Sequence, residues 1–228
     1  MELSTVEKCK DAWYRLVGVA SDDPGLTEQG DLTDDVAYQY LTLGCRNAQR
    51  WMLKMGYGGW RKRSSALVFT GSDATDGGRK ITLPSDFLRA YGNRRESALR
   101  KADGTRWASE VSPEDDHIRG DYYYVRGTEL WITREAQPPS PLYLDYHYTH
   151  PLWSASLSPI DFPIDARWLI VAEGADAAKD ESWLPGGVEW EQKIARRLAR
   201  AREEARDIAR ATKSPRKARA PQRFGNRW

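Results

Sequence analysis

The sequence predicts an α+β fold in which helices from both ends of the chain form one bundle, with a block of strands inserted between them. Two observations predict it: apolar residues recur every three or four positions near both ends, whereas the middle third alternates with a period of two. A third observation concerns charge. The 228-residue chain has a net charge of only +2, yet its last 36 residues carry 13 Lys/Arg against three acids. Residues 1–192 therefore sum to about −8, and a chain charged oppositely in two parts can bind polyanions or acidic copies of itself.

Composition limits the protein class. Apolar content of 40% and charged content of 30% are typical of a globular protein, and no apolar run approaches the ~18–20 residues of a membrane span. The N-terminus has no basic region followed by an apolar stretch, so we expect no secretion signal. Two cysteines, Cys9 and Cys45, give no disulfide framework, and we expect reduced, cytosolic thiols.

Two helices are expected in the N-terminal part, residues 1–62. Residues 2–19 can form the first because their apolar positions make one stripe, and Pro24 with Gly25 ends that region. The second starts at Thr33, whose hydroxyl can cap it, and Gly56-Tyr-Gly-Gly stops it. The first stripe comprises Leu3, Val6, Cys9, Trp13, Leu16 and Val17, and the second comprises Ala37, Leu41, Ala48, Met52 and Met55.

The middle part, residues 63–162, is expected to hold about six short strands in a small antiparallel sandwich or barrel, because turn signals recur roughly every ten residues. Pro84 closes one strand, and Ser85 or Asp86 is expected to cap a short turn of helix. The expected strands are Ala66–Thr70, Arg79–Leu83, Trp107–Val111, Tyr122–Val125, Glu129–Thr133 and Leu142–Tyr148.

Helices return in residues 163–210. Asp165 is expected to cap a helix that runs to about Lys179, with Trp168, Leu169, Ala172, Ala175 and Ala178 facing inward. The last helix should run from Val188 to about Arg210. Its inward stripe comprises Trp190, Ile194, Leu198, Ala201, Ala205 and Ile208, and its opposite face carries Arg196, Arg200, Glu203 and Asp207 at spacings that permit pairing. Residues 211–228 form a basic, Pro-broken extension.

No set of residues has the pattern of a catalytic or metal site, so we expect no enzyme, no cofactor and no metal. His147 and His150, on or just after a strand, should be solvated and point to different faces, and His117 lies in an acidic loop. Gly56-Tyr-Gly-Gly lacks the Lys-Ser/Thr of a phosphate loop.

The basic extension is the candidate site. Its six cations have no competing acids and can contact phosphates or an acidic protein surface. Its two aromatics can stack on bases or anchor in an apolar groove, whereas a solvated terminus, the alternative, gains nothing from exposing them. The candidate residues are Lys213, Arg216, Lys217, Arg219, Arg223, Phe224, Arg227 and Trp228.

Roughly residues 33–210 carry a recognisable order of landmarks. A helical N-terminus is followed by a strand ending in a Leu-Pro-x-Asp-Phe turn, a Tyr-rich hairpin, a Tyr-rich strand, a Trp/Ala helix and a long charged helix. The stretches concerned are Ile81-Thr-Leu-Pro-Ser-Asp-Phe-Leu, Tyr122-Tyr-Tyr-Val-Arg-Gly-Thr-Glu-Leu-Trp-Ile, Leu142-Tyr-Leu-Asp-Tyr-His-Tyr and Phe162-Pro-Ile-Asp-Ala-Arg-Trp-Leu-Ile-Val-Ala-Glu-Gly-Ala. This order resembles that of the head-to-tail adaptor (connector, or head-completion) proteins of tailed bacteriophages.

This resemblance implies a virion structural protein that is assembled in the host cytoplasm and forms a ring, usually of twelve copies, beneath the portal protein. The ring would extend the channel for packaged DNA and present a platform to tail proteins, with no membrane partner. It also implies that a C-terminal extension, here residues 211–228, reaches toward the portal. The alternative from charge alone is a nucleic-acid-binding protein that uses its basic C-terminal segment.

Overall fold

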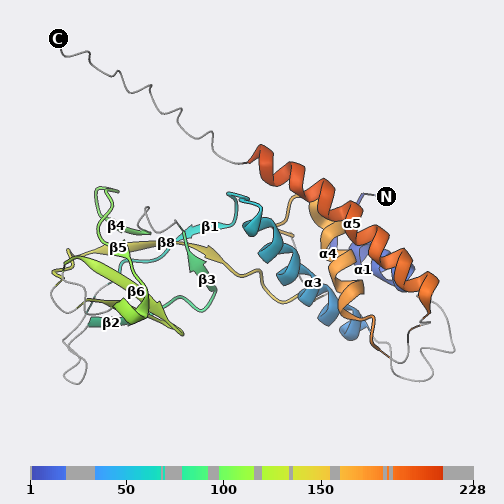
Figure 1. The fold of residues 1–228 in the computed structure, drawn as a ribbon, viewed down its shortest axis with the longest axis horizontal. Coiled ribbons are helices and arrows are strands. Elements are labelled where there is room, and N and C mark those ends of the chain that lie inside the picture. Colours follow the sequence, from blue (N-terminus) through green and yellow to red (C-terminus); the bar gives the residue numbers. More distant parts are fainter. Residues whose placement is uncertain are drawn as a thin grey trace, which may run out of the picture. The chain divides into compact units, whose positions relative to one another are not determined.

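The chain divides into two compact units. The computed structural model describes residues 2–18, 34–67, 69, 79–91, 98–115, 120–133, 136–154, 160–181, 184 and 187–212. The helical unit comprises Met1–Gly59 and His150–Trp228, and the β unit comprises Trp60–Thr149. Helices occupy the first unit and strands the second (Figure 1), which confirms the predicted α+β class.

The two N-terminal helices are α1, Val6–Val17, and α3, Asp34–Lys54. The Thr5 hydroxyl caps α1 by accepting a hydrogen bond from the Lys8 amide, and Gly18 ends it at φ 82°. The predicted stripe of α1 is buried throughout. The predicted cap of α3, Thr33, lies outside the described residues. The predicted buried face of α3 is confirmed except at Met55, which is half-buried just beyond the helix end.

Helix α4, Arg167–Ala177, is buried on nearly all sides. A short 3₁₀ turn, η2, Ile164–Ala166, precedes it. The predicted cap by Asp165 is wrong, because the residue at the cap position is Ala166 and it makes no side-chain capping bond. The inward residues were predicted correctly except Trp168, which is only half-buried.

Helices α3 and α4 pack closely enough to exclude side chains at their crossing. A Cβ atom added to Gly44 would lie 2.2 Å from the Ile170 carbonyl oxygen, and one added to Gly174 would lie 2.8 Å from that of Tyr40. Glycine is therefore the residue that this crossing requires.

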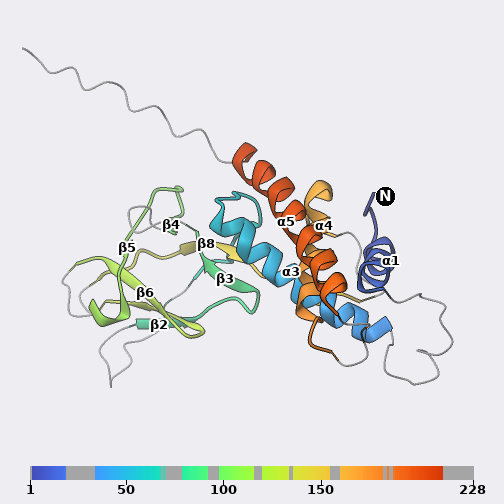
Figure 2. The ribbon, with the colours of Figure 1, turned by 45° about the vertical axis from the view of Figure 1, so that its right-hand side comes forward.

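The last helix, α5, spans Val188–Ala211 and runs beside α4 (Figure 1 and Figure 2). Its predicted inward stripe is buried, apart from the half-buried Ile208, and Ala209 joins it. The Trp190 indole N–H donates to the Val17 carbonyl at 2.9 Å, which ties the start of α5 to the end of α1. None of the described helices is both long and apolar enough to cross a membrane.

The described part of the β unit contains two four-stranded sheets. In the first, β8 is the central strand, and it pairs antiparallel with β1, β3 and β4. The second has the order β2-β7-β6-β5, and its β5–β6 pair is parallel, so the predicted antiparallel unit contains one parallel pair at this edge. The strands are β1 Arg61–Arg63, β2 Arg79–Thr82, β3 Phe87–Ala90, β4 Leu99–Lys101, β5 Ser109–Glu110, β6 Tyr122–Arg126, β7 Glu129–Ile132 and β8 Leu142–Tyr148. A 3₁₀ turn, η1, Pro113–Asp115, follows β5.

Some strand predictions hold and others fail. The β6–β7 hairpin and the bounds of β8 are confirmed. The predicted strand Ala66–Thr70 is wrong: the described part of it has a single bridge, between Leu67 and Leu142. The short basic strand β1 was missed, because three exposed charged residues carry no apolar alternation.

The predicted helical turn at Ser85 or Asp86 is also wrong, because strand β3 begins at Phe87. The Asp86 carboxylate accepts hydrogen bonds from Lys62 Nζ at 2.7 Å and from the Tyr146 hydroxyl at 2.8 Å. It therefore ties β3 to its sheet and does not cap a helix.

One hydrophobic core serves both sheets. Leu99, Leu142 and Leu144 of the first sheet belong to the same buried cluster as Leu130 and Ile132 of the second. Both sheets therefore bury their apolar residues in one place, as in a small sandwich.

Candidate functional site

The eight residues predicted for docking, Lys213, Arg216, Lys217, Arg219, Arg223, Phe224, Arg227 and Trp228, lie outside the described residues. The structure describes the residues immediately before this segment, at the end of α5. The Thr212 hydroxyl donates to the Ile208 and Ala209 carbonyls, each at 3.1 Å, at the end of α5. The role of these eight residues stays a prediction.

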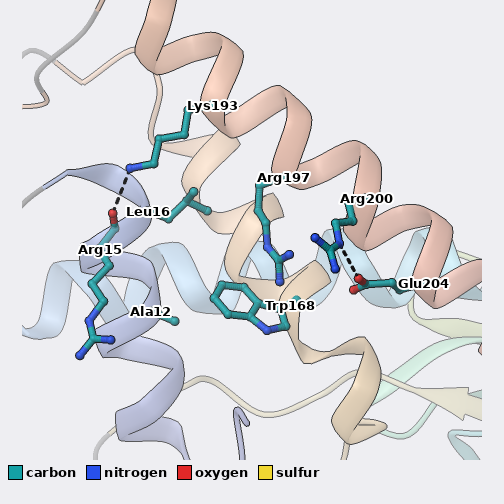
Figure 3. Close-up of a pocket in the computed structure, with 8 residues that line it drawn as sticks. All are labelled: Ala12, Arg15, Leu16, Trp168, Lys193, Arg197, Arg200 and Glu204. Atoms are coloured by element: carbon teal, nitrogen blue, oxygen red, sulfur yellow. Dashed lines mark hydrogen bonds and ion pairs between the residues drawn. The ribbon is translucent and has the colours of Figure 1, made fainter. Parts of the chain in front are cut away.

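A strongly charged concave surface among the described residues is a hollow of about 520 Å³ in the helical unit (Figure 3). We call it the cationic hollow. Helix α1 forms one wall, α5 forms the other, and Trp168 of α4 lies between them. Four cations and one carboxylate line it. The lining residues are Ala12, Arg15, Leu16, Trp168, Lys193, Arg197, Arg200 and Glu204.

Arg197 lies at the centre of the cationic hollow. Its guanidinium carbon is 3.8 Å from the centroid of the Trp168 ring, a cation–π contact. Its Nε is buried and has no hydrogen-bond partner among the described residues. Burial lowers the pKa of Arg197 below its ordinary value, and repulsion from Arg200 lowers it further, while attraction to Glu204 opposes both. Because Nε itself is buried, an acceptor oxygen entering the hollow would meet the rest of this half-buried, partly desolvated guanidinium.

Two cations near Arg197 already make hydrogen bonds within the helical unit. Arg200 Nε donates to Glu204 Oε1 at 3.0 Å along α5, with 73% of the Arg200 side chain exposed. Lys193 Nζ donates to the Arg15 carbonyl oxygen at 3.3 Å, at the C-terminal end of α1. The hollow therefore keeps an excess of positive charge.

Pairing on the rest of α5 differs from the prediction. Arg200 pairs with Glu204 and not with Glu203, and Asp207 pairs with Arg210. Arg202 binds the buried Glu173 of α4 at 2.9 Å. Three of the seven basic residues of α5 thus form ion pairs within the described structure.

Two further hollows lie on the helical unit. The acidic hollow, of about 410 Å³, adjoins the cationic one and is lined by Glu2, Leu3, Ile164, Asp165, Trp168, Glu204 and Ile208. An apolar groove of about 730 Å³ includes the exposed Leu43 and Leu152 and is lined by Asp35, Tyr38, Gln39, Thr42, Leu43, Leu152, Trp153 and Ser154.

The prediction of solvated histidines is wrong for the two that the structure describes. His147 is 3% exposed and His150 is 6% exposed, and burial lowers the pKa of His150 to about 4. The prediction failed because the outer face of β8 is covered at His147, where Tyr91 packs edge-on at 5.2 Å. His117 lies outside the described residues.

The thiols lie in α1 and α3 as predicted, both free and buried. Burial raises the pKa of both Cys9 and Cys45 to about 12, so neither is a reactive thiolate at neutral pH. No group of three or more metal-ligating side chains occurs in the described ranges.

The cationic hollow was not predicted from the sequence. The signal was present: Lys193, Arg197 and Arg200 are spaced by four and three residues and so share one flank of α5. Trp168 was predicted to belong to the core, so its position beside these three side chains was not expected. The packing of α4 against α5 is a tertiary contact that local spacing in the sequence does not reveal.

Comparison with known proteins identifies the family. A search of curated proteins finds no match. The family model described as SU10 adaptor protein matches residues 15–219, which include the described parts of α3, both sheets, α4 and α5. The match confirms the resemblance drawn from the order of the sequence landmarks. The chain therefore belongs to the SU10 adaptor protein family, a family of phage head-to-tail adaptors.

Proposed function

We propose that this phage adaptor forms a ring, of twelve copies, bound beneath the portal protein. The ring extends the channel for packaged DNA and offers its other face to tail proteins. The observation that carries this proposal is the family match over residues 15–219, which spans nearly the whole chain. A structural role in the virion also fits the buried, unreactive thiols and the buried histidines of the described residues.

Residues 213–228 are proposed as the segment that docks on the portal or on a neighbouring copy. Six cations and two aromatics suit a surface with carboxylates around an apolar pocket. Phe224 and Trp228 would be the anchors, because buried aromatics supply most of the energy of such contacts. Lys213, Arg216, Lys217, Arg219, Arg223 and Arg227 would steer the approach and set its register.

The experiment is truncation after Thr212, which leaves α5 and its terminal hydrogen bonds intact. The truncated chain should fold with an unchanged circular dichroism spectrum and fail to join portal-containing heads, assayed by electron microscopy and infectivity reconstitution. Normal joining by the truncated chain would refute the docking role. Failure of the full chain to bind portal at all would refute the adaptor ring itself.

A second variant separates protein docking from DNA binding. Phe224→Ala with Trp228→Ala keeps all six cations of the segment. If the segment docks on protein, this variant loses head joining and keeps whatever affinity the protein has for duplex DNA. If the segment binds nucleic acid, joining survives and the full chain binds duplex DNA with a steep salt dependence.

A further inference from the structure

Along one flank of α5 the side chains change from basic to acidic and then to apolar. Lys193, Arg197, Arg200, Glu204 and Ile208 follow at intervals of three or four residues, which places them in one row along the helix. The cationic hollow lies along the first part of this row and the acidic hollow along the last. Trp168 and Glu204 line both hollows, so the two form one continuous face.

The two halves of this face carry opposite charge. The cationic half has Arg15, Lys193, Arg197 and Arg200 against Glu204. The acidic half has Glu2, Asp165 and Glu204 and no cation in its lining. Apolar groups lie along it, because Ile164 is exposed at 38% and Trp168 is half-buried. A face with a basic end, an aromatic centre and an acidic, apolar end is complementary to itself when rotated by half a turn.

We infer that this face binds a second copy of the protein in a two-fold dimer. In the dimer the cationic hollow of one copy lies against Asp165 and Glu2 of the other, and the same contact repeats across the axis. The two Trp168 side chains meet near that axis. The Arg197 guanidinium, whose Nε makes no hydrogen bond among the described residues, then lies beside a carboxylate of the other copy.

The structure explains why Arg197 is central to the contact. Stacking on Trp168 fixes its guanidinium in one orientation, so little side-chain freedom is lost when a carboxylate binds. Burial has already removed part of its water, as its lowered pKa indicates. Ion pairs between fully exposed side chains contribute little, whereas a pre-oriented and partly desolvated arginine beside apolar surface contributes more.

Duplex DNA is a poorer occupant of the face. Three carboxylates lie within it, and each repels backbone phosphates. A second copy offers carboxylates for the cationic half and cations for the acidic half at the same time. A two-fold contact also consumes the same patch on both copies and cannot extend into a ring. The dimer is therefore a form of the free protein, and the inference does not depend on the proposed ring.

The test is sedimentation velocity of the full chain with two charge-reversed variants. The first carries Arg197→Glu and Arg200→Glu, and the second carries Glu2→Lys and Asp165→Lys. Wild type should dimerise at low salt, and each variant alone should have a dissociation constant at least about tenfold higher, because like charges then meet. An equimolar mixture of the two variants should recover the dimer, since each reversed half then faces an opposite charge.

The matched control is Arg196→Glu with Arg206→Glu, an equal charge change at exposed positions of α5 outside both hollows. It should dimerise as wild type does. A wild type that stays monomeric at about 100 µM and low salt overturns the inference, since weaker contacts fall outside the range of specific pairs. A mixture that fails to recover the dimer overturns it too. Wild-type binding to a 20-base-pair duplex that is lost in the first variant would reassign the face to nucleic acid. None of these results depends on joining to heads.

Discussion

Arg167 joins three segments of the helical unit through one side chain. It is 9% exposed, and its guanidinium donates to four carbonyl oxygens. Two belong to the N-terminal residues Leu3 and Ser4, and two belong to Ile160 and Phe162, ahead of α4. The distances run from 2.8 to 3.1 Å. An arginine is needed because its planar fork reaches several acceptors at once.

Replacing Arg167 should therefore destabilise the protein strongly. Arg167→Leu leaves buried carbonyls without donors, and we expect a loss of about 3 kcal/mol in the free energy of unfolding. Urea denaturation followed by circular dichroism measures it. The exposed Arg206→Leu is the matched control and should change stability by no more than about 0.5 kcal/mol. Equal stability of the two variants would show that the four bonds are dispensable.

His150 predicts a pH dependence of stability. Its folded pKa is lowered from 6.5 to about 4 by burial. Below pH 6.5 the unfolded chain binds a proton at this residue that the folded chain does not bind until pH is near 4. The contribution of His150 to the free energy of unfolding is thus complete above pH 6.5 and is lost as the pH falls. At pH 4 the loss amounts to about 3 kcal/mol.

The measurement compares wild type with His150→Phe between pH 7 and pH 4. Carboxylates with lowered pKa values, such as Asp34 and Asp86, contribute the same acid slope to both proteins. The unfolding free energy of wild type minus that of His150→Phe isolates the contribution of the histidine. This difference should fall as pH falls, because only wild type loses the stability of the neutral histidine. Parallel pH profiles would show that His150 binds protons equally in the folded and unfolded states, which would contradict a pKa lowered by burial.

At the scale of elements, the α3–α4 crossing gives a prediction whose sign is informative. An isolated helix gains about 1 kcal/mol when glycine becomes alanine. Gly44→Ala should instead destabilise by several kcal/mol, because the new Cβ would lie 2.2 Å from the Ile170 carbonyl oxygen and the helices must separate. Thermal unfolding of Gly44→Ala and of the exposed Ala195→Gly tests this. A stabilised Gly44→Ala would mean that the crossing is looser than described.

The elements that sequence predicted well are those whose own residues determine them. Helix α5 and strand β8 have strong periodicity, and both have close to the predicted bounds. Strand β1 and the turn before β3 depend on partners far away in the chain, Asp145 and Tyr146, which no local pattern announces. Asp165 had the right chemistry for a cap, yet the intervening 3₁₀ turn displaced it. The cationic hollow was not predicted for the same reason, since residues from three helices form it.

At the scale of the whole molecule, the two units should differ in whether they fold alone. The β unit, Trp60–Thr149, is continuous in sequence and has its own core. The helical unit draws on both ends of the chain, because α1 and α3 pack against α4 and α5. A fragment of residues 60–149 should unfold cooperatively on heating, whereas a fragment of residues 1–59 should lack cooperative unfolding. An excised β unit without a thermal transition would contradict this.

The β unit also begins and ends at the same place, because the Tyr148 amide donates to the Trp60 carbonyl at 3.3 Å. A segment whose two ends are already held together can be cut out and replaced by a short bridge, or by another domain with neighbouring ends, with little loop entropy to overcome. We therefore expect a different β unit with neighbouring ends to be accepted at this place while the helices keep their packing. The hydrogen bond between Trp60 and Tyr148 marks the junction at which such an exchange should be made.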